Sequence, residues 1–449
     1  MQNIEKIIIG AGPTGLGAGY RLKELGQNSF LILEKNSYPG GLSASFKDNQ
    51  GFTWDIGGHV LFSHYQYFDE LIDNLLGAEY LSHKRISRVR MAGRWIPYPF
   101  QNNIRYLPED MQWECIQGLL ELSDNNKTVN NFAQWMQSRF GSGIVRLFMR
   151  PYNFKVWAHL AEDMDFDWIA ERVSVLDLKR ILKNIILKRD DVAWGPNNKF
   201  KFPLHGGTGK IFSRLANKIK EHIIYNNQVS HIDTENKILW TEDGSKYHYQ
   251  NILNTSPLDK FMHNIYPASN KVQKAASSLK HNSVHISGIG IRETKEDSTC
   301  WMYFPENNCP FYRVTNFHNY SPNNTPDSLK FSSFMTECSF SEFKPEDIES
   351  LNQQSIAGLE NTSLISAQDR EKIESVWSYT ADYAYPIPCL DRDKALGLIQ
   401  PWLESRNIYS RGRFGGWKYE VGNMDHSVMQ GVEWAERIVQ GREEKTYPG

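Results

Sequence analysis

An apolar strand that runs directly into a glycine-rich turn begins this chain and limits its fold more than any other feature. Residues 7–9 are three isoleucines, a β-branched run typical of a parallel strand buried on both faces. Gly10, Gly12 and Gly15 follow with the spacing G-x-G-x-x-G. A second apolar run ends at Glu34, about 20 residues beyond the glycines, where a carboxylate can hold ribose hydroxyls. This order predicts a Rossmann-like dinucleotide site, and a purely structural turn is the alternative.

The three glycines have separate roles in such a site. Gly10 permits a tight turn, Gly12 lets the backbone approach a pyrophosphate, and Gly15 lets the next helix pack closely on the strand. The helix expected from about Pro13 to Leu25 points its first N–H groups at that pyrophosphate. The motif by itself does not distinguish NAD from FAD.

Two further glycine loops follow Glu34. Residues 39–44 read Pro-Gly-Gly-Leu-Ser-Ala, and residues 55–59 read Asp-Ile-Gly-Gly-His. Consecutive glycines let a backbone lie against a flat ring, because no Cβ is in the way. This order resembles the superfamily of flavin amine oxidases and UDP-galactopyranose mutases, which implies FAD along this edge; two ordinary turns are the alternative. His59 is then expected to abut the flavin and set its reactivity rather than to act as an acid or base, and a packing histidine is the alternative.

Composition excludes several classes of function. Lys plus Arg number 50 and Asp plus Glu 52, a balance that gives no indication of nucleic acid or of an anionic membrane surface as a partner. The five cysteines form no C-x-x-C pair and no metal-like cluster, so a reduced, cytoplasmic protein is expected. The N-terminus enters a strand at once, which leaves no room for a signal peptide. No apolar run of 18 residues, hydrolytic triad, Walker loop or metal signature is present, so neither a membrane span nor a metal is expected.

The 449 residues suffice for two or three domains, and the pattern of the chain divides them. The fold class expected is α/β (α+β). Residues 1–63, 200–255 and 391–449 are expected to form a discontinuous FAD-binding Rossmann-like domain. Residues 64–199 are expected to be an inserted helical domain with a nucleotide pocket and a mobile flap, and 256–390 an antiparallel sheet domain.

Helical spacing of apolar residues predicts helices in 67–77, 130–141, 142–160 and 176–187. A short hairpin and an aromatic loop are expected between them, in 85–104. Beyond residue 205, a helix near 209–221 and strands near 223, 229, 238 and 252 look like the rest of the nucleotide-binding sheet, and the C-terminal segment adds a strand near 409 and a closing helix.

Aromatic residues stand beside polar and cationic ones in several short segments, namely 150–158, 194–203, 301–313 and 409–423. A diphosphate requires fixed cations, and arginine supplies bidentate geometry. A uracil or sugar face requires aromatic surface. For any single arginine a surface ion pair is the alternative, but four such segments in one FAD protein indicate an anionic, nucleotide-linked substrate.

Several stretches together resemble the eukaryotic UDP-galactopyranose mutase family of fungi and protozoan parasites. They are GFTWDIGGHVLFSHYQYFD, WIPYPFQNN, RPYNFKVWA, WGPN, GGTG, WMYFPE, PFYR and SRGRFGGWKYEVGNMDHS, which occur in family order and span nearly the whole chain. The resemblance implies an FAD domain, a helical domain and a six-stranded sheet domain.

The same resemblance implies an isomerase that interconverts UDP-galactopyranose and UDP-galactofuranose. In that family reduced FAD attacks the anomeric carbon through N5, UDP leaves, and the flavin–sugar adduct opens and recloses as the other ring form. NADPH or NADH would reduce the flavin, and the electrons would not be consumed. The alternatives are a mutase for another nucleotide-linked sugar, a flavin oxidase of the amine oxidase class, and a flavin-binding protein without turnover.

The family pattern, carried onto this chain, gives three sets of site residues. The catalytic set is His59, Arg172 and Arg313, the two arginines being the diphosphate clamp. The cofactor set is Gly10, Gly12, Pro13, Thr14, Gly15, Glu34, Lys35, Gly41, Leu42, Ser43, Gly57, Gly58, His59, Val229, Arg413, Gly422, Asn423, Met424 and Ser427. The substrate set is Arg85, Tyr98, Gln101, Asn153, Trp157, Arg172, Asn197, Trp301, Tyr303, Arg313, Tyr385, Arg413, Tyr419 and Asn423.

Within these sets Tyr98 and Gln101 match the uracil platform and its amide, and Asn197 matches an asparagine on a flap that is expected to close on UDP. Two features depart from the family. The chain is shorter than fungal members, whose additional helices make oligomer contacts, so a homo-oligomer is left open. The segment TECSFSEFK, 336–344, replaces a more acidic strand end.

Overall fold

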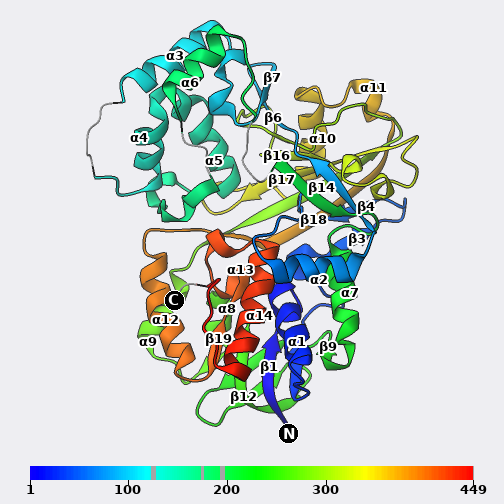
Figure 1. Cartoon of the computed structure of the whole chain (residues 1–449), viewed down its shortest axis with the longest axis vertical. Coiled ribbons are helices and arrows are strands. Elements are labelled where there is room, and N and C mark those ends of the chain that lie inside the picture. The colour runs from blue at the N-terminus through cyan, green and yellow to red at the C-terminus, as the bar shows by residue number, and fades with distance from the viewer. Residues whose placement is uncertain (123–127, 173–175, 193–197, 448–449) are drawn as a thin grey trace.

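Parallel pairing of the N-terminal strand with two others builds the lower half of the molecule (Figure 1). The computed structural model describes residues 1–122, 128–172, 176–192 and 198–447, with side chains undescribed at 170–172. Within these ranges the first sheet has eight strands. Their order is β13 (Ile265–Tyr266), β10 (Val229–Asp233), β11 (Ile238–Thr241), β12 (Lys246–Asn254), β1 (Gln2–Ile9), β2 (Phe30–Leu33) and β9 (Ile223–Ile224), with β19 (Ile408–Ser410) paired to β12.

Both faces of this sheet are covered by helices, as predicted for an apolar run of β-branched residues. Successive side chains of a strand point to opposite faces, so Ile8 packs in one core and Ile7 and Ile9 in the other. The first core contains residues of α1 (Pro13–Glu24), α2 (Gln66–Leu76), α7 (Gly209–Lys218) and α14 (Met424–Gln440). The second contains residues of α8 (Leu258–His263), α9 (Asn270–Ser277), α12 (Arg392–Glu404) and α13 (Gly412–Gly415).

A second sheet lies above the first in Figure 1. Its order in the described chain is β18 (Ile373–Pro386), β14 (His281–Ile291), β17 (Ser332–Phe340), β16 (Arg313–Asn316), β15 (Trp301–Tyr303), β6 (Ser87–Met91) and β7 (Arg94–Pro97). All neighbours are antiparallel except β15 and β6. Helices α10 (Leu351–Asn361) and α11 (Ala367–Arg370) lie at its outer end (Figure 1).

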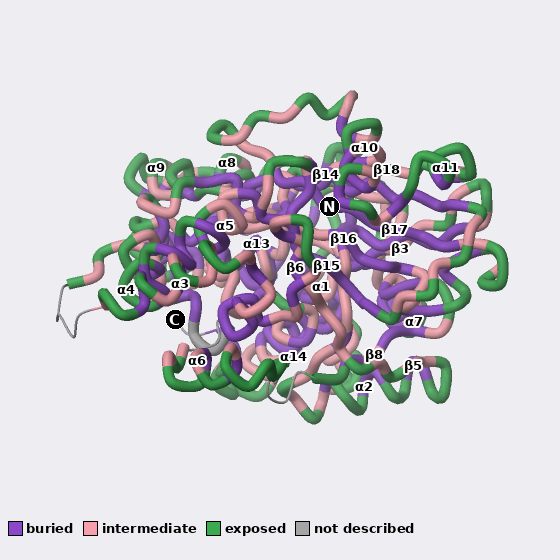
Figure 2. Tube along the Cα trace, turned by 90° about the horizontal axis from the view of Figure 1, so that it is seen from above, coloured by how far each residue is buried: buried purple, intermediate pink, exposed green. Residues whose placement is uncertain are grey.

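The helical part occupies the upper left of Figure 1. It comprises α3 (Glu109–Leu120), α4 (Phe132–Ile144), a π-helical turn (Val145–Met149), α5 (Arg150–Trp157) and α6 (Leu178–Ile186). Two small sheets complete the fold. They are β3 (Ser45–Lys47) with β4 (Thr53–Asp55), and β5 (Tyr80–Lys84) with β8 (Lys199–Pro203). Figure 2 shows that the labelled strands of the second sheet run through the buried interior, while the outer helices and loops alternate buried and exposed positions.

Most predicted elements are confirmed, and one connection was not foreseen. The α/β fold, the first helix, the hairpin of β6 and β7 and the closing helix all form. That hairpin, however, joins the second sheet through β6 and β15 and adds two strands to it. The sheet has seven strands in the described chain, whereas the resemblance implied six. Parallel pairing between strands more than 200 residues apart leaves no local trace in the sequence. None of the helices in the described ranges is long and apolar enough to cross a membrane.

Candidate functional site

The glycine turn after β1 folds as the motif requires. Gly10 has φ = +100°, in the left-handed region, and a Cβ added to Gly15 would lie 1.9 Å from the Gly10 carbonyl oxygen. Any side chain at Gly15 would therefore push α1 away from β1. A Cβ added to Gly12 would meet no atom within 4 Å. The space over Gly12 is thus open to a ligand that contacts the backbone.

Glu34 ends β2 beside this turn and is only 4% exposed. Its Oε2 accepts the Ala11 N–H at 2.7 Å, and its Oε1 accepts the Asn36 N–H at 2.8 Å. Each carboxylate oxygen keeps a second lone pair for a ribose hydroxyl. The second glycine loop lies against the first, because a Cβ on Gly41 would be 3.4 Å from the Cα of Gly12.

The middle of α14 packs against the start of α1. A Cβ added to Gly431 would lie 2.0 Å from the Thr14 carbonyl oxygen, so the two helices are in backbone contact. Asn423 is the N-cap of α14, and the buried hydroxyl of Ser427 faces the Gly422 carbonyl at 3.5 Å. The N-terminus of α1, which is favourable for anions, is therefore held in place by α14.

The other expected cofactor residues lie on or beside these elements, except Val229. Pro13 begins α1, Lys35 is exposed after β2, Leu42 and Ser43 belong to the 3-10 turn Gly41–Ser43, Val229 is buried at the start of β10, and Met424 begins α14.

The loop that carries His59 is fixed to the second sheet. The Gly58 N–H donates to Glu337 Oε1 at 3.0 Å, and a Cβ on Gly58 would lie 2.5 Å from Thr315 Oγ1. Burial lowers the pKa of the His59 imidazole to about 4. The positive charges of Arg413 and Arg313 lower this pKa as well, whereas the negative charge of Glu337 raises it. The ring is therefore neutral. Among the described residues, His59 Nδ1 and Thr315 Oγ1 are buried without a hydrogen-bond partner.

Asp55 supports this loop from the end of β4. It is fully buried and accepts the Ser45 hydroxyl at 2.5 Å and the Thr208 hydroxyl at 3.0 Å. Burial raises the pKa of the Asp55 carboxyl to about 7, although these hydrogen bonds favour its ionised form.

Arg313 on β16 and Glu337 on β17 form a bidentate ion pair. Arg313 Nε donates to Oε1 and Nη2 donates to Oε2, each at 2.7 Å. The Tyr312 hydroxyl also donates to Oε2, at 2.7 Å. Burial opposes ionisation of Glu337, but Arg313 and the hydrogen bonds from Tyr312 and Gly58 outweigh it, so the pKa lies below its ordinary value.

Glu337 is a site residue that the sequence reasoning missed. The sequence does contain an indication of its role, because Glu337 is the single charged residue in the strand Ser332–Phe340, whose other residues are apolar or neutral. A charge in a fully buried strand requires a partner. The segment was noticed only as a departure from the family pattern.

Aromatic rings and an arginine form one wall near β15. Tyr98 and Tyr303 lie 4.9 Å apart between ring centroids, and Tyr152 meets Tyr303 edge to face at 5.4 Å. Trp301 Nε1 donates to the Tyr303 hydroxyl at 2.5 Å. The Arg85 guanidinium lies over the Trp301 ring, 4.8 Å from its centroid. Flat apolar faces and a cation thus occur together, as a nucleotide requires.

A second wall is formed by Trp157, Tyr385 and Tyr419. Trp157 meets Tyr419 at 4.9 Å and Tyr385 at 5.8 Å, both edge to face. The Arg413 guanidinium lies 5.0 Å from the Tyr385 ring centroid and 5.6 Å from that of Tyr419. The Tyr385 hydroxyl is 3.1 Å from the Tyr312 hydroxyl, which links this wall to the Arg313–Glu337 pair.

Arg413 joins the two halves of the molecule. Its Nε donates to the Ala384 carbonyl at 3.0 Å, at the end of β18, and its Nη1 donates to the Gly422 carbonyl at 3.1 Å, before α14. Arg413, which is expected to contact both cofactor and substrate, therefore lies between β18 and the segment before α14.

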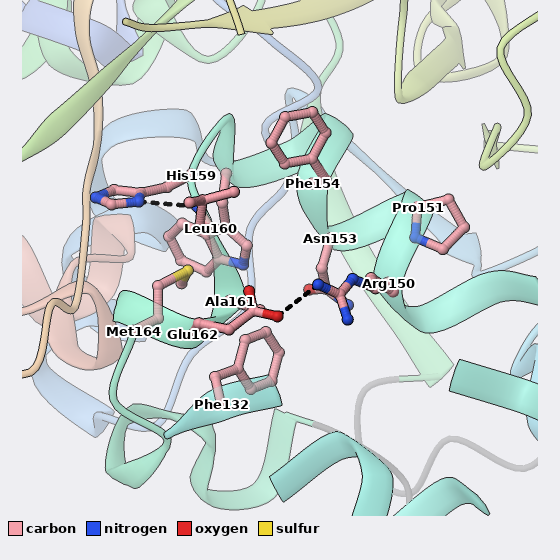
Figure 3. Close-up of a pocket in the computed structure, with 11 residues that line it drawn as sticks. Phe132, Arg150, Pro151, Asn153, Phe154, His159, Leu160, Ala161, Glu162 and Met164 are labelled. Atoms are coloured by element: carbon pink, nitrogen blue, oxygen red, sulfur yellow. Dashed lines mark hydrogen bonds and ion pairs between the residues drawn. The ribbon is translucent and has the colours of Figure 1, made fainter. Parts of the chain in front are cut away.

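Asn153 and Trp157, one helical turn apart on α5, both line a cavity of about 310 Å³ (Figure 3). The cavity has Phe132 and Met164 on its floor and the Arg150–Glu162 ion pair at its edge. Asn153 Nδ2 donates to the Met149 carbonyl at 2.7 Å. Gln101 is buried close to Tyr98, beyond the cis bond of Pro99.

Two expected substrate residues lie outside the described parts of the chain. They are Asn197 and the side chain of Arg172, and most of the expected flap, 193–199, is outside as well.

Comparison with known proteins identifies the N-terminal unit. Residues 8–75 match the family model of an NAD(P)-binding Rossmann-like domain. This range contains the glycine turn, Glu34, both further glycine loops and His59.

Solved structures resemble the whole chain. One is reduced UDP-galactopyranose mutase, at 42% sequence identity and a TM-score of 0.96, covering 100% of this chain and 97% of that one. Putrescine oxidase bound to putrescine has 16% identity and a TM-score of 0.68, with 98% and 100% covered. A CLA-producing fatty acid isomerase from P. acnes has 17% identity and a TM-score of 0.66, with 97% and 99% covered. The last two share the fold.

Proposed function

The chain belongs to the UDP-galactopyranose mutase family, from which we infer that it is an isomerase that interconverts UDP-galactopyranose and UDP-galactofuranose with FAD. The observation that carries this conclusion is the 42% identity over the entire chain, with a TM-score of 0.96. The site agrees in chemistry, because two aromatic walls and three arginines suit a nucleoside diphosphate attached to a sugar.

The residues on the N-terminal side fit FAD. Open space over Gly12 and the start of α1 suit a pyrophosphate, and Glu34 retains lone pairs for ribose. His59 Nδ1 and Thr315 Oγ1, buried and unsatisfied within the described chain, suit the polar edge of a flavin. We propose that the cofactor residues predicted from the sequence line this path.

The chemistry that the reduced cofactor supplies when bound is nucleophilic displacement of UDP at the anomeric carbon. His59 stays neutral at physiological pH because its pKa is about 4. We therefore assign to it a hydrogen bond to the flavin, not a proton transfer. Gly57 and Gly58 let its loop lie directly against Glu337 and Thr315 of the second sheet.

Arg313 is proposed to hold the diphosphate while its charge is positioned by Glu337. Glu337 engages Nε and Nη2, so the Nη1 amino group is the part left for a phosphate oxygen. Arg413 and Arg85 are proposed to contact the same substrate from the two aromatic walls. Arg172 is proposed, from the family resemblance, as the second arginine of the clamp.

The uracil is proposed to lie on Tyr98, with Gln101 bonding its edge and Asn153 and Trp157 on the same nucleotide side of the pocket. Trp301, Tyr303, Tyr385 and Tyr419 are proposed to surround the diphosphate and sugar, with Asn423 at the cofactor end and Asn197 on a closing flap. Closure would exclude water, which would otherwise capture the reacting sugar.

Finer assignments are also proposals. They are reduction by NADPH or NADH, assembly as a homo-oligomer, a cytoplasmic location, and the three-domain division with boundaries at 63, 199, 255 and 390.

An anaerobic assay tests the function. The purified FAD-loaded protein is reduced with dithionite and incubated with UDP-galactofuranose, and the products are separated by chromatography. Conversion to UDP-galactopyranose only when the flavin is reduced supports the mutase. Binding of UDP without isomerisation would indicate a mutase that acts on another nucleotide-linked sugar. Turnover that consumes oxygen without prior reduction would replace it by an oxidase.

A further inference from the structure

Two histidines and an aspartate that are far apart in the sequence meet beside the start of α14. His64 Nδ1 lies 2.8 Å from Asp425 Oδ2, and His426 Nδ1 lies 2.9 Å from Asp425 Oδ1. One potential ligand atom from each residue lies within 4.8 Å of the others. None of the three belongs to the cofactor or substrate residues assigned above.

The carboxylate at the centre of this cluster is buried and held in place. The Asp425 side chain is 2% exposed and stands in the first turn of α14. Its Oδ2 also accepts the backbone N–H of His64, at 3.3 Å. A negative charge fixed by the helix is therefore presented to both imidazoles.

The cluster is also accessible from solvent. The His64 side chain is 54% exposed, whereas that of His426 is 14% exposed. The two rings are 5.1 Å apart between centroids and tilted by 51°. An ion that enters from the His64 side would keep open positions for water, as three-ligand sites do.

We propose that His64, Asp425 and His426 bind one divalent transition-metal ion of the Zn²⁺ class. Two imidazoles and one carboxylate are ligands that Zn²⁺ accepts, at about 2.0–2.2 Å each. Ligand atoms around such an ion are roughly 3–4 Å apart, so the rings need to shift only slightly from their present hydrogen-bonded positions. Each imidazole that binds through Nδ1 places its remaining proton on Nε2.

The ion would connect two parts of the cofactor site. His64 follows the loop Gly57–His59 by five residues, and Asp425 follows Asn423 by two. A metal at this position would therefore tie the segment after the His59 loop to the first turn of α14.

Local spacing could not have shown this site. His64 and Asp425 are 361 residues apart, and metal motifs read from a sequence depend on ligands that are close together in it. The alternative arrangement is a set of hydrogen bonds in which the carboxylate simply joins the two histidines.

Zinc titration of the FAD-loaded protein distinguishes the two arrangements. The protein, without an affinity tag, is freed of metal with a chelator, which is then removed, and ZnCl₂ is titrated by calorimetry. We expect one strongly bound Zn²⁺ per chain. His64→Ala removes an exposed ligand and should weaken this binding about tenfold or more. Asp425→Asn, which keeps the shape of the side chain, should weaken it similarly.

The matched control is His263→Ala. His263 is also exposed and also has its Nδ1 bonded to an oxygen, the Asp259 carbonyl at 2.8 Å, but it has no place in the cluster. This variant should bind zinc as the wild type does. A rise in Tm with Zn²⁺ in the wild type, absent in His64→Ala, gives a second readout. Equal zinc affinity in wild type, His64→Ala and Asp425→Asn would overturn the metal site and leave the hydrogen-bonded arrangement.

Discussion

Glu337 and Arg313 stand directly opposite each other on β17 and β16, and their two parallel hydrogen bonds are each 2.7 Å long. The same carboxylate accepts the Gly58 N–H from the loop beside His59. One buried residue therefore connects the loop assigned to the flavin with the arginine assigned to the diphosphate. The pair serves both stability and function, and the two roles can be separated.

Breaking this ion pair on one side should destabilise the protein. Glu337→Ala leaves the Arg313 charge without its partner, and we expect the free energy of unfolding to fall by about 3 kcal/mol. This value is at the low end of the range for buried ion pairs, because the arginine side chain is 22% exposed. The double variant Arg313→Leu with Glu337→Leu removes both charges and should recover most of this loss. Urea denaturation measures both. Equal destabilisation by the single and double variants would show that the packing of β16 and β17, not the charge, matters.

Two glycines of the first turn should respond differently to the same added methyl group. Gly12→Ala puts a Cβ into open space, so the fold should keep its stability within about 0.5 kcal/mol while FAD affinity falls. Gly15→Ala puts a Cβ 1.9 Å from the Gly10 carbonyl and should prevent α1 from packing on β1. Circular dichroism and flavin titration separate the outcomes. Normal FAD binding by Gly12→Ala would place the pyrophosphate elsewhere.

The sequence predicted the N-terminal unit well because its signals are local. The spacing of Gly10, Gly12 and Gly15 and the position of Glu34 depend on two strands, one turn and one helix, all within 34 residues. Helices α4, α5 and α6 of the inserted part were also predicted, because the 3.6-residue period is a local property. Helix α3 was missed.

Contacts between distant segments could not be predicted in this way. The pairing of β6 with β15 joins residues 87–89 to 301–303, and the loop Gly57–His59 contacts Thr315 and Glu337. Glu337 was missed for the same reason, since its role depends on the strand beside it. The aromatic residues, in contrast, were predicted individually from family motifs, but their grouping into two walls required the fold.

The stability of the protein should depend on pH through Asp55. Its pKa is raised to about 7 in the folded state, so folding favours the protonated carboxyl. The stabilisation is complete below the unfolded pKa of about 4 and is lost as the pH rises to about 7, by about 1.4 kcal/mol per pH unit. Asp55→Asn cannot titrate and should lack this dependence. Unfolding free energies of both proteins between pH 4 and 8 give the test, and a constant difference between them would exclude the shifted pKa.

UDP and uridine should separate the diphosphate contacts from the base contacts. Arg313→Ala should leave FAD bound but weaken UDP binding by about 2–4 kcal/mol, the usual scale for one partner of a desolvated charge pair. The same variant should bind uridine as the wild type does, because uridine has no phosphate.

Tyr98→Ala should weaken the binding of UDP and of uridine equally, by about 1–3 kcal/mol, if the uracil stacks on its ring. Tyr266→Ala, which removes a tyrosine that is 64% exposed, is the control. Calorimetric titration of the FAD-loaded wild type and variants measures the affinity of each protein for UDP and for uridine. A uridine affinity that falls with Arg313→Ala, or is unchanged in Tyr98→Ala, would reverse the proposed orientation of the nucleotide, with the base at the arginine and the phosphates at the aromatic wall.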